Sequence, residues 1–148
     1  MSWRKASDHM RTALRNLVVP ALRSRGFSGS FPNLYRVRDA RVDLLSFQFS
    51  QFGPSLYIEI ASCAVSGATG DECALAPPSK LRRHHAGLYF RRIGPMPSLD
   101  FDNVESLEDA KPQVERALRA ICIEGETWWR SPTPVAPPNK SLERTREG

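Results

Sequence analysis

The first part of the chain alternates between apolar and charged positions in a way that predicts a helix over about residues 4–25. Apolar residues recur at the spacing of one helix face, at Met10, Leu14, Leu17, Val18, Ala21 and Leu22. The opposite side carries a charged stripe, Arg4, Asp8, Arg11 and Arg15, which we expect to be solvated. Pro20 should kink this helix and Gly26 should end it.

The next part of the chain follows a period of two, which is typical of strands with one buried face. Strands are predicted at residues 31–38, 41–50 and 56–65, with a fourth at 88–93. In the clearest strand, Leu45, Phe47 and Phe49 should face the core, and Ser46, Gln48 and Ser50 should face away from it. The connections between the first three strands are so short that these strands must be antiparallel.

A second helix is predicted after Ser106, because the segment Ser106 to Asp109 has the form of a capping box. Gly125 should end this helix, and Trp128-Trp129 should pack back on the sheet or on the first helix. The expected fold class is therefore α+β, an antiparallel sheet of three to four strands flanked by an N-terminal and a C-terminal helix. The exposed sheet face would carry a candidate interaction surface, Ser46, Gln48, Tyr57 and Glu59.

Composition sets the domain organisation. The chain has 148 residues, of which 41% are hydrophobic and 25% charged, and this suits one globular domain. Residues 1–130 are expected to form that domain. Residues 131–148 hold four of the twelve prolines and few apolar side chains, so a disordered tail is predicted there. No apolar run is long enough to span a membrane and no signal peptide is visible, so a cytoplasmic location is expected.

Charge is distributed in blocks of alternating sign, although the net charge is +5. Residues 1–48 hold nine basic and three acidic side chains, and residues 93–130 hold eight acidic and four basic ones. Residues 80–92 form a candidate basic patch, Lys80, Arg82, Arg83, Arg91 and Arg92, interleaved with aromatic residues. Such a patch can bind nucleic acid. The neighbouring acidic blocks favour neutralisation within the fold instead.

Catalytic, metal and cofactor sites are not indicated. His84 and His85 are adjacent, so they point in different directions and do not chelate as an i, i+4 pair would. The three cysteines have no metal-binding spacing, and Cys73 lies beside two acids that disfavour a thiolate. The acids at residues 100–109 surround a helix N-terminus, where they complement the helix dipole. No phosphate-binding loop is present.

Six short segments are spread over about residues 8–130: Leu17 to Leu22, Arg25-Gly26-Phe27, Leu34-Tyr35-Arg36, Phe47-Gln48-Phe49-Ser50, Arg92-Ile93-Gly94 and Trp128-Trp129. Together, these segments resemble the bacterial DUF4304 family. This family has no assigned activity, so the resemblance carries over no catalytic or ligand-binding residue. It implies an α+β fold with two terminal helices.

The tail carries a second resemblance. Residues 137–146 are similar to the translated read-through of the recombination sites that end integron gene cassettes. That resemblance implies an accessory protein spread on mobile cassettes, with a tail that is a by-product of the DNA element.

A small, non-enzymatic binding or protein-interaction module is the favoured function, with a protein as the expected partner. It would use the exposed sheet face or the loop at residues 66–86. Nucleic-acid binding through residues 80–92 is the alternative, and a small-ligand-binding enzyme is the third possibility. The oligomeric state is not indicated by the sequence.

Overall fold

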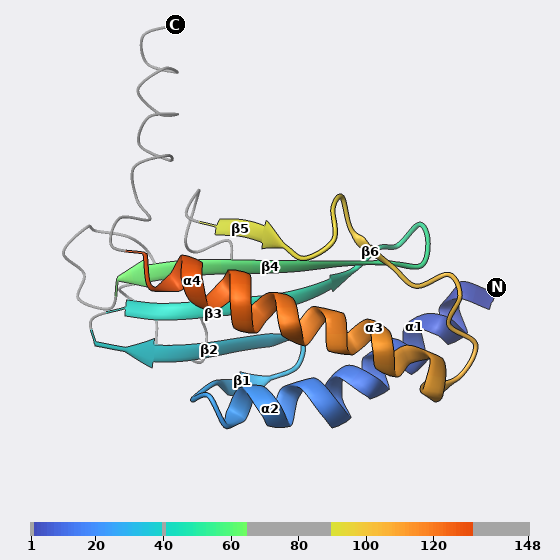
Figure 1. Ribbon diagram of the computed structural model, residues 1–148, viewed down its shortest axis with the longest axis horizontal. Helices are drawn as coiled ribbons and strands as arrows, with labels where there is room; N and C mark the ends of the chain where they lie inside the picture. Colours follow the sequence, from blue (N-terminus) through green and yellow to red (C-terminus); the bar gives the residue numbers. More distant parts are fainter. Residues whose placement is uncertain (1, 40, 65–89, 132–148) are drawn as a thin grey trace, which may run out of the picture.

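A computed structural model of the chain describes residues 2–39, 41–64 and 90–131. The loop predicted at residues 66–86, most of the candidate basic patch and the tail beyond Ser131 lie outside these residues. In the described part, two helical arms lie on one face of an antiparallel sheet (Figure 1). The α+β class expected from the sequence is therefore confirmed.

The N-terminal arm is helical almost without interruption. It consists of α1 (Ser2–Ala13), a π-helical turn η1 (Leu14–Val18) and α2 (Val19–Arg23). The wider turn is marked by the backbone N–H of Val19, which donates to the carbonyl of Leu14, five residues earlier. It ends two residues before Pro20, whose missing N–H removes an ordinary helical hydrogen bond. Gly26 follows the arm with a φ of 99°, which favours glycine.

The sheet has six strands in the described residues, two more than the highest number expected. Five of them run in the order β1 (Ser28–Ser30), β2 (Asn33–Arg38), β3 (Arg41–Phe49), β4 (Ser55–Ala64) and β5 (Phe90–Ile93). The sixth, β6 (Leu99–Asp100), pairs with β4 beyond the end of β5. Every pairing is antiparallel. The two missed strands, β1 and β6, are too short to show a period of two.

The C-terminal arm begins with the predicted cap and continues further than expected. Ser106 Oγ accepts a hydrogen bond from the backbone N–H of Asp109 at 3.2 Å, and α3 spans Leu107–Ala120. The arm passes through the π-helical turn η5 (Ile121–Gly125) to α4 (Glu126–Trp129). The expectation that Gly125 ends the helix is therefore wrong. A Cβ at Gly125 would lie 3.2 Å from the Trp129 ring, so this glycine permits close packing.

The main core lies between the sheet and both arms. Figure 1 shows α3 in front of β2 and β3, with α1 and α2 alongside. Leu45 and Phe47 of β3 are buried there with Ile58 and Ile60 of β4, as the alternation predicted. Trp129 is buried in the same core, and its Nε1 donates to the carbonyl of Ala61 at 2.9 Å. The expected return of this tryptophan onto the sheet is confirmed.

The register of β3 can be tested with two neighbouring residues. Phe47 is 2% exposed and stacks on Phe31, whereas Gln48 is exposed on the other face. We expect Phe47→Ala to lower the free energy of unfolding by about 3–5 kcal/mol. Gln48→Ala should lower it by less than about 1 kcal/mol. Urea denaturation measures both, and the reverse order of costs would contradict this register.

Candidate functional site

The predicted interaction surface does not form one open face. Ser46 and Glu59 lie opposite each other in the β3–β4 register and are only 5% and 2% exposed. Gln48 is exposed, and Tyr57, its partner in register, is half-buried. The expectation that all four side chains are solvent-exposed is therefore wrong for Ser46 and Glu59.

A second, smaller apolar cluster accounts for part of this burial. On the same face, Val42, Leu44, Ala61 and Cys63 form a buried group, against which Tyr35 packs. Burial is thus nearly complete toward the β2–β3 hairpin and decreases toward the β3–β4 connection. Alternation along a strand identifies which side chains share a face, but it does not show whether that face is covered.

The described part of the candidate basic patch is Arg91 and Arg92, both exposed. Arg92 Nε donates to a carboxylate oxygen of Glu59 at 2.8 Å, and its guanidinium lies 4.2 Å from the centre of the Tyr57 ring. The structure therefore joins Arg92 to two residues of the predicted surface. Lys80, Arg82 and Arg83 lie outside the described residues.

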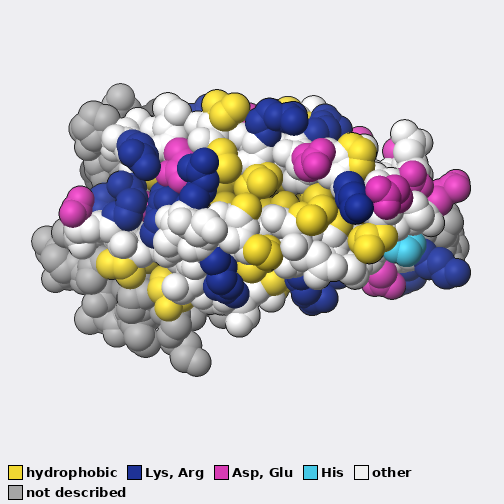
Figure 2. All heavy atoms as spheres, turned by 60° about the horizontal axis from the view of Figure 1, so that its bottom comes forward, with side chains coloured by type: hydrophobic (Ala, Val, Ile, Leu, Met, Phe, Trp, Pro, Cys, Tyr) yellow, Lys and Arg dark blue, Asp and Glu magenta, His cyan; other side chains and the backbone are white. Residues whose placement is uncertain are grey.

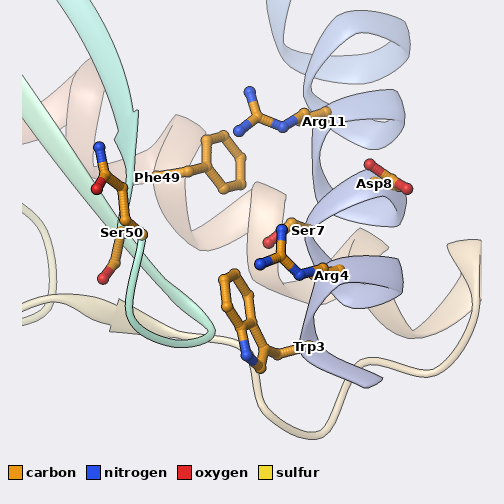
Figure 3. Close-up of a pocket in the computed structure, with 8 residues that line it drawn as sticks. Trp3, Arg4, Ser7, Asp8, Arg11, Phe49 and Ser50 are labelled. Atoms are coloured by element: carbon orange, nitrogen blue, oxygen red, sulfur yellow. The ribbon is translucent and has the colours of Figure 1, made fainter. Parts of the chain in front are cut away.

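A different site lies where α1 passes the β3–β4 connection. A pocket of about 480 Å³ is bordered by Trp3, Arg4, Ser7, Asp8 and Arg11 of α1 and by residues 49–51. Figure 3 shows Trp3, Arg4, Ser7 and Arg11 on the side of the helix that faces Phe49, whereas the Asp8 carboxylate points away. This volume falls in the usual range of small-molecule sites.

Both arginines of the pocket stack on aromatic rings. The Arg11 guanidinium carbon lies 4.0 Å from the centre of the Phe49 ring, and that of Arg4 lies 5.0 Å from the Trp3 ring. Phe49 is itself held edge-on against the buried Phe101. Stacking occupies the flat face of a guanidinium and leaves its N–H groups, which lie in its plane, able to bind an anion.

The positive charge of these two arginines is not neutralised by a nearby carboxylate. Within the described residues, neither Arg4 nor Arg11 has a carboxylate oxygen within 4.0 Å. Ser7 adds a neutral donor, because this residue is 7% exposed, lines the pocket and forms no hydrogen bond through its hydroxyl with the described chain. Two guanidinium groups and a hydroxyl suit an anionic ligand.

A second hollow, of about 430 Å³, lies on the other side of Trp3 and has the opposite character. It is bordered by Lys5 together with the acids Asp102 and Glu105. An anion would meet two carboxylates there and no arginine. The Arg4–Arg11 pocket is therefore the better anion site of the two.

The charged stripe that the sequence predicts on the first helix contains two residues of this pocket, Arg4 and Arg11. We expected that stripe to be solvated and did not predict a pocket there. Helical periodicity places Arg4 and Arg11 on the polar side of the first helix. Their partner Phe49 is far away in sequence, and its position opposite Arg11 depends on how the helix packs on the sheet. That packing could not be inferred from helical periodicity.

The described residues offer no metal centre, because no three His, Cys, Asp or Glu side chains among them cluster closely enough to hold an ion. None of the helices in this part of the chain combines the length and the hydropathy needed to cross a membrane.

A buried ionic cluster, which the spacing of charges along the chain does not indicate, lies at the opposite end of the sheet. Arg36 Nε donates to Asp43 at 2.9 Å, and its two terminal nitrogens donate to both carboxylate oxygens of Glu126 at 3.0 and 2.8 Å. Arg38 also donates to Asp43 through two nitrogens. The Arg36 guanidinium lies near the rings of Phe27 and Trp129, at 4.5 and 5.3 Å.

These contacts keep both members of the Arg36–Glu126 pair charged. Burial raises the pKa of Glu126, but the hydrogen bonds and the charge of Arg36 outweigh burial and hold the pKa below its ordinary value. Burial lowers the pKa of Arg36, but the hydrogen bonds to Glu126 and Asp43 outweigh it and leave the pKa raised. Arg36 donates four hydrogen bonds inside the protein. We therefore interpret this cluster as structural.

The Glu126 pair predicts a pH dependence of stability. The pKa of the Glu126 carboxyl is lowered in the folded protein. The stabilisation by this pair is therefore fully present above about pH 4.5, the ordinary pKa of a glutamate, and is lost as the pH falls below that value. We expect Glu126→Gln to lower the free energy of unfolding by about 3 kcal/mol at neutral pH. Urea denaturation at several pH values should show this difference shrinking below pH 4.5.

The matched control is Glu115→Gln, an exposed position on α3. The free energy of unfolding of this variant should differ little from that of the unchanged protein at every pH. A Glu126→Gln difference that stays constant from neutral pH to pH 3 would contradict the charged pair.

Comparison with known proteins identifies the family. The model of the family described as "Domain of unknown function (DUF4304)" matches residues 18–131, which is most of the chain. The chain belongs to this family, as the sequence segments indicated. No curated protein and no solved structure matches it. The match begins at Val18, so the pocket residues of α1 lie before the matched region.

Proposed function

We propose that this protein is a non-enzymatic binding module that holds an anionic ligand in the pocket between α1 and the β3–β4 connection. The observation that carries the proposal is the pair of guanidinium groups of Arg4 and Arg11. Both stack on aromatic rings, and in the described part of the chain no carboxylate oxygen lies within 4.0 Å of either group. A phosphate or carboxylate group can accept two hydrogen bonds from one guanidinium, which makes arginine a strong ligand for such groups.

The chemistry of the pocket supports binding over catalysis. Its two hydroxyls are those of Ser7 and Ser50, and its one acid is Asp8. Ser7 and Asp8 are consecutive on a helix and therefore point in different directions, and the Asp8 carboxylate also points away from Ser50 (Figure 3). A nucleophile activated by a neighbouring base needs the two groups within hydrogen-bonding distance. The protein partner expected from the sequence stays a prediction, with Gln48 and Tyr57 as the open part of the sheet face.

The proposal is tested by calorimetric titration with inorganic phosphate and with thymidine monophosphate at low ionic strength. We expect saturable binding of at least one of them. Because a charge-assisted contact is lost, Arg11→Gln and Arg4→Gln should each weaken binding about tenfold.

The control is Arg119→Gln, an exposed arginine of α3 that borders a different hollow. This variant also loses one positive charge. If the contacts made by Arg4 and Arg11 are specific, the affinity of the Arg119→Gln protein for the anion should stay within about twofold of that of the unchanged protein. Unchanged melting temperatures would show that each variant is folded. Absence of saturable binding, or equal weakening by Arg119→Gln, would overturn the proposal.

A further inference from the structure

We infer that the ligand of this site is the phosphodiester backbone of a single-stranded nucleic acid, lying along α1. The inference rests on the proposed function, because it takes the Arg4–Arg11 pocket as the anion site and extends it by Arg15. Nothing in it depends on residues 80–92, the segment that the sequence suggested for nucleic-acid binding.

The first observation is a third arginine that repeats the arrangement of the pocket. The Arg15 guanidinium carbon lies 5.1 Å from the centre of the Phe31 ring, just as Arg11 lies over Phe49 and Arg4 over Trp3. Phe31 in turn stacks on the buried Phe47. Three arginines along one helix are thus each held beside an aromatic ring.

The second observation is that these arginines lie in a row. At 3.6 residues per turn, positions 11 and 15 fall within about 20° of position 4 around the helix axis. At 1.5 Å per residue, position 11 lies about 10 Å along the axis from position 4, and position 15 lies about 6 Å beyond position 11. Adjacent phosphates of an extended single strand are spaced on a similar scale. A ligand with one anionic group would engage only part of this row.

The third observation is the charge around the row. Within the described residues, no carboxylate oxygen lies within 4.0 Å of any of the three guanidinium groups. On the face shown in Figure 2, basic side chains lie in separate patches around an apolar strip, and several of them have acidic side chains beside them. Among the described residues, Arg4, Arg11 and Arg15 thus form a row without a carboxylate partner, and a polyanion can gain from contact with each of them.

The fourth observation is an aromatic side chain that the fold leaves in solvent. Phe52 is 92% exposed in the β3–β4 connection, directly after Gln51, which borders the pocket. The backbone N–H of Phe52 is held by Ser50 Oγ at 3.0 Å. An exposed ring next to a residue that borders the pocket offers a surface on which a base of the strand can stack.

The test uses fluorescence anisotropy of labelled twelve-nucleotide oligothymidylate and oligouridylate at several salt concentrations. We expect each to bind more tightly than thymidine monophosphate, with an affinity that falls as salt rises. Arg15→Gln should weaken oligonucleotide binding and lower the log–log salt slope by about 0.7, the value for one lost contact with a single strand. It should leave thymidine monophosphate binding unchanged, because Arg15 lies outside the pocket.

Two further variants separate base stacking from charge. Phe52→Ala should weaken oligonucleotide binding about tenfold without changing the salt slope, because no phosphate contact is lost. Arg119→Gln is the control and should change neither quantity. Arg15→Gln and Phe52→Ala both change exposed side chains, so their melting temperatures should remain close to that of the unchanged protein.

The outcomes distinguish this inference from the proposed function. If thymidine monophosphate binds in the pocket but the oligonucleotides bind no more tightly, the inference fails and the proposed function stands. If the oligonucleotides, thymidine monophosphate and inorganic phosphate all fail to bind, both fail. Tighter binding of duplex DNA than of the single strand would overturn the inference. So would binding to vesicles containing phosphatidylserine that depends on Phe52, while oligonucleotides do not bind.

Discussion

The paired charges around Arg36 are the constraint on which the arrangement of the layers depends. The Arg36 side chain extends from the centre of β2 into a space closed by the rings of Phe27 and Trp129. A guanidinium in such a place is strongly destabilising unless its charge is compensated. Asp43 from β3 and Glu126 from α4 supply that compensation. The sheet and the C-terminal arm are therefore held together by charges that cannot separate without leaving one of them buried alone.

The same cluster also fixes the end of the N-terminal arm. Arg36 donates to the carbonyl of Arg25, and the Arg25 side chain reaches Glu126 at 3.3 Å. The arm is thus attached where α2 ends, and α1 extends from there toward the β3–β4 connection at the other end of the sheet (Figure 1). One end of the arm is held at the ionic cluster, and Met10 and Leu14 are packed in the core. Together, these contacts set the height of α1 above the sheet. That height determines that Arg11 meets Phe49 and that Arg15 meets Phe31, whereas the ring beside Arg4 is Trp3 of α1 itself.

The fold and the site differ in how far the sequence could predict them. The alternation around Phe47 identified the core face of β3 correctly, because a period of two is a local property of the chain. The same alternation could not show that Ser46 and Glu59 are covered, since coverage depends on what packs above the face. Arg36 and Glu126 are 90 residues apart, so nothing in the spacing of charges indicated that they meet. A glycine in a helical pattern predicts a helix end, but Gly125 lies within the C-terminal arm and makes room for Trp129.

The protein uses arginine beside aromatic rings in two places, and a comparison of the two indicates what each does. At Arg36 the ring contacts accompany two buried carboxylates, so its N–H groups are occupied. At Arg4, Arg11 and Arg15 the ring contacts remain but the described chain supplies no carboxylate beside them. Stacking restricts the motion of a guanidinium, and an anion that binds it therefore loses less affinity to side-chain ordering. An arrangement that is structural when the chain provides the anion becomes a binding site when a ligand has to provide it.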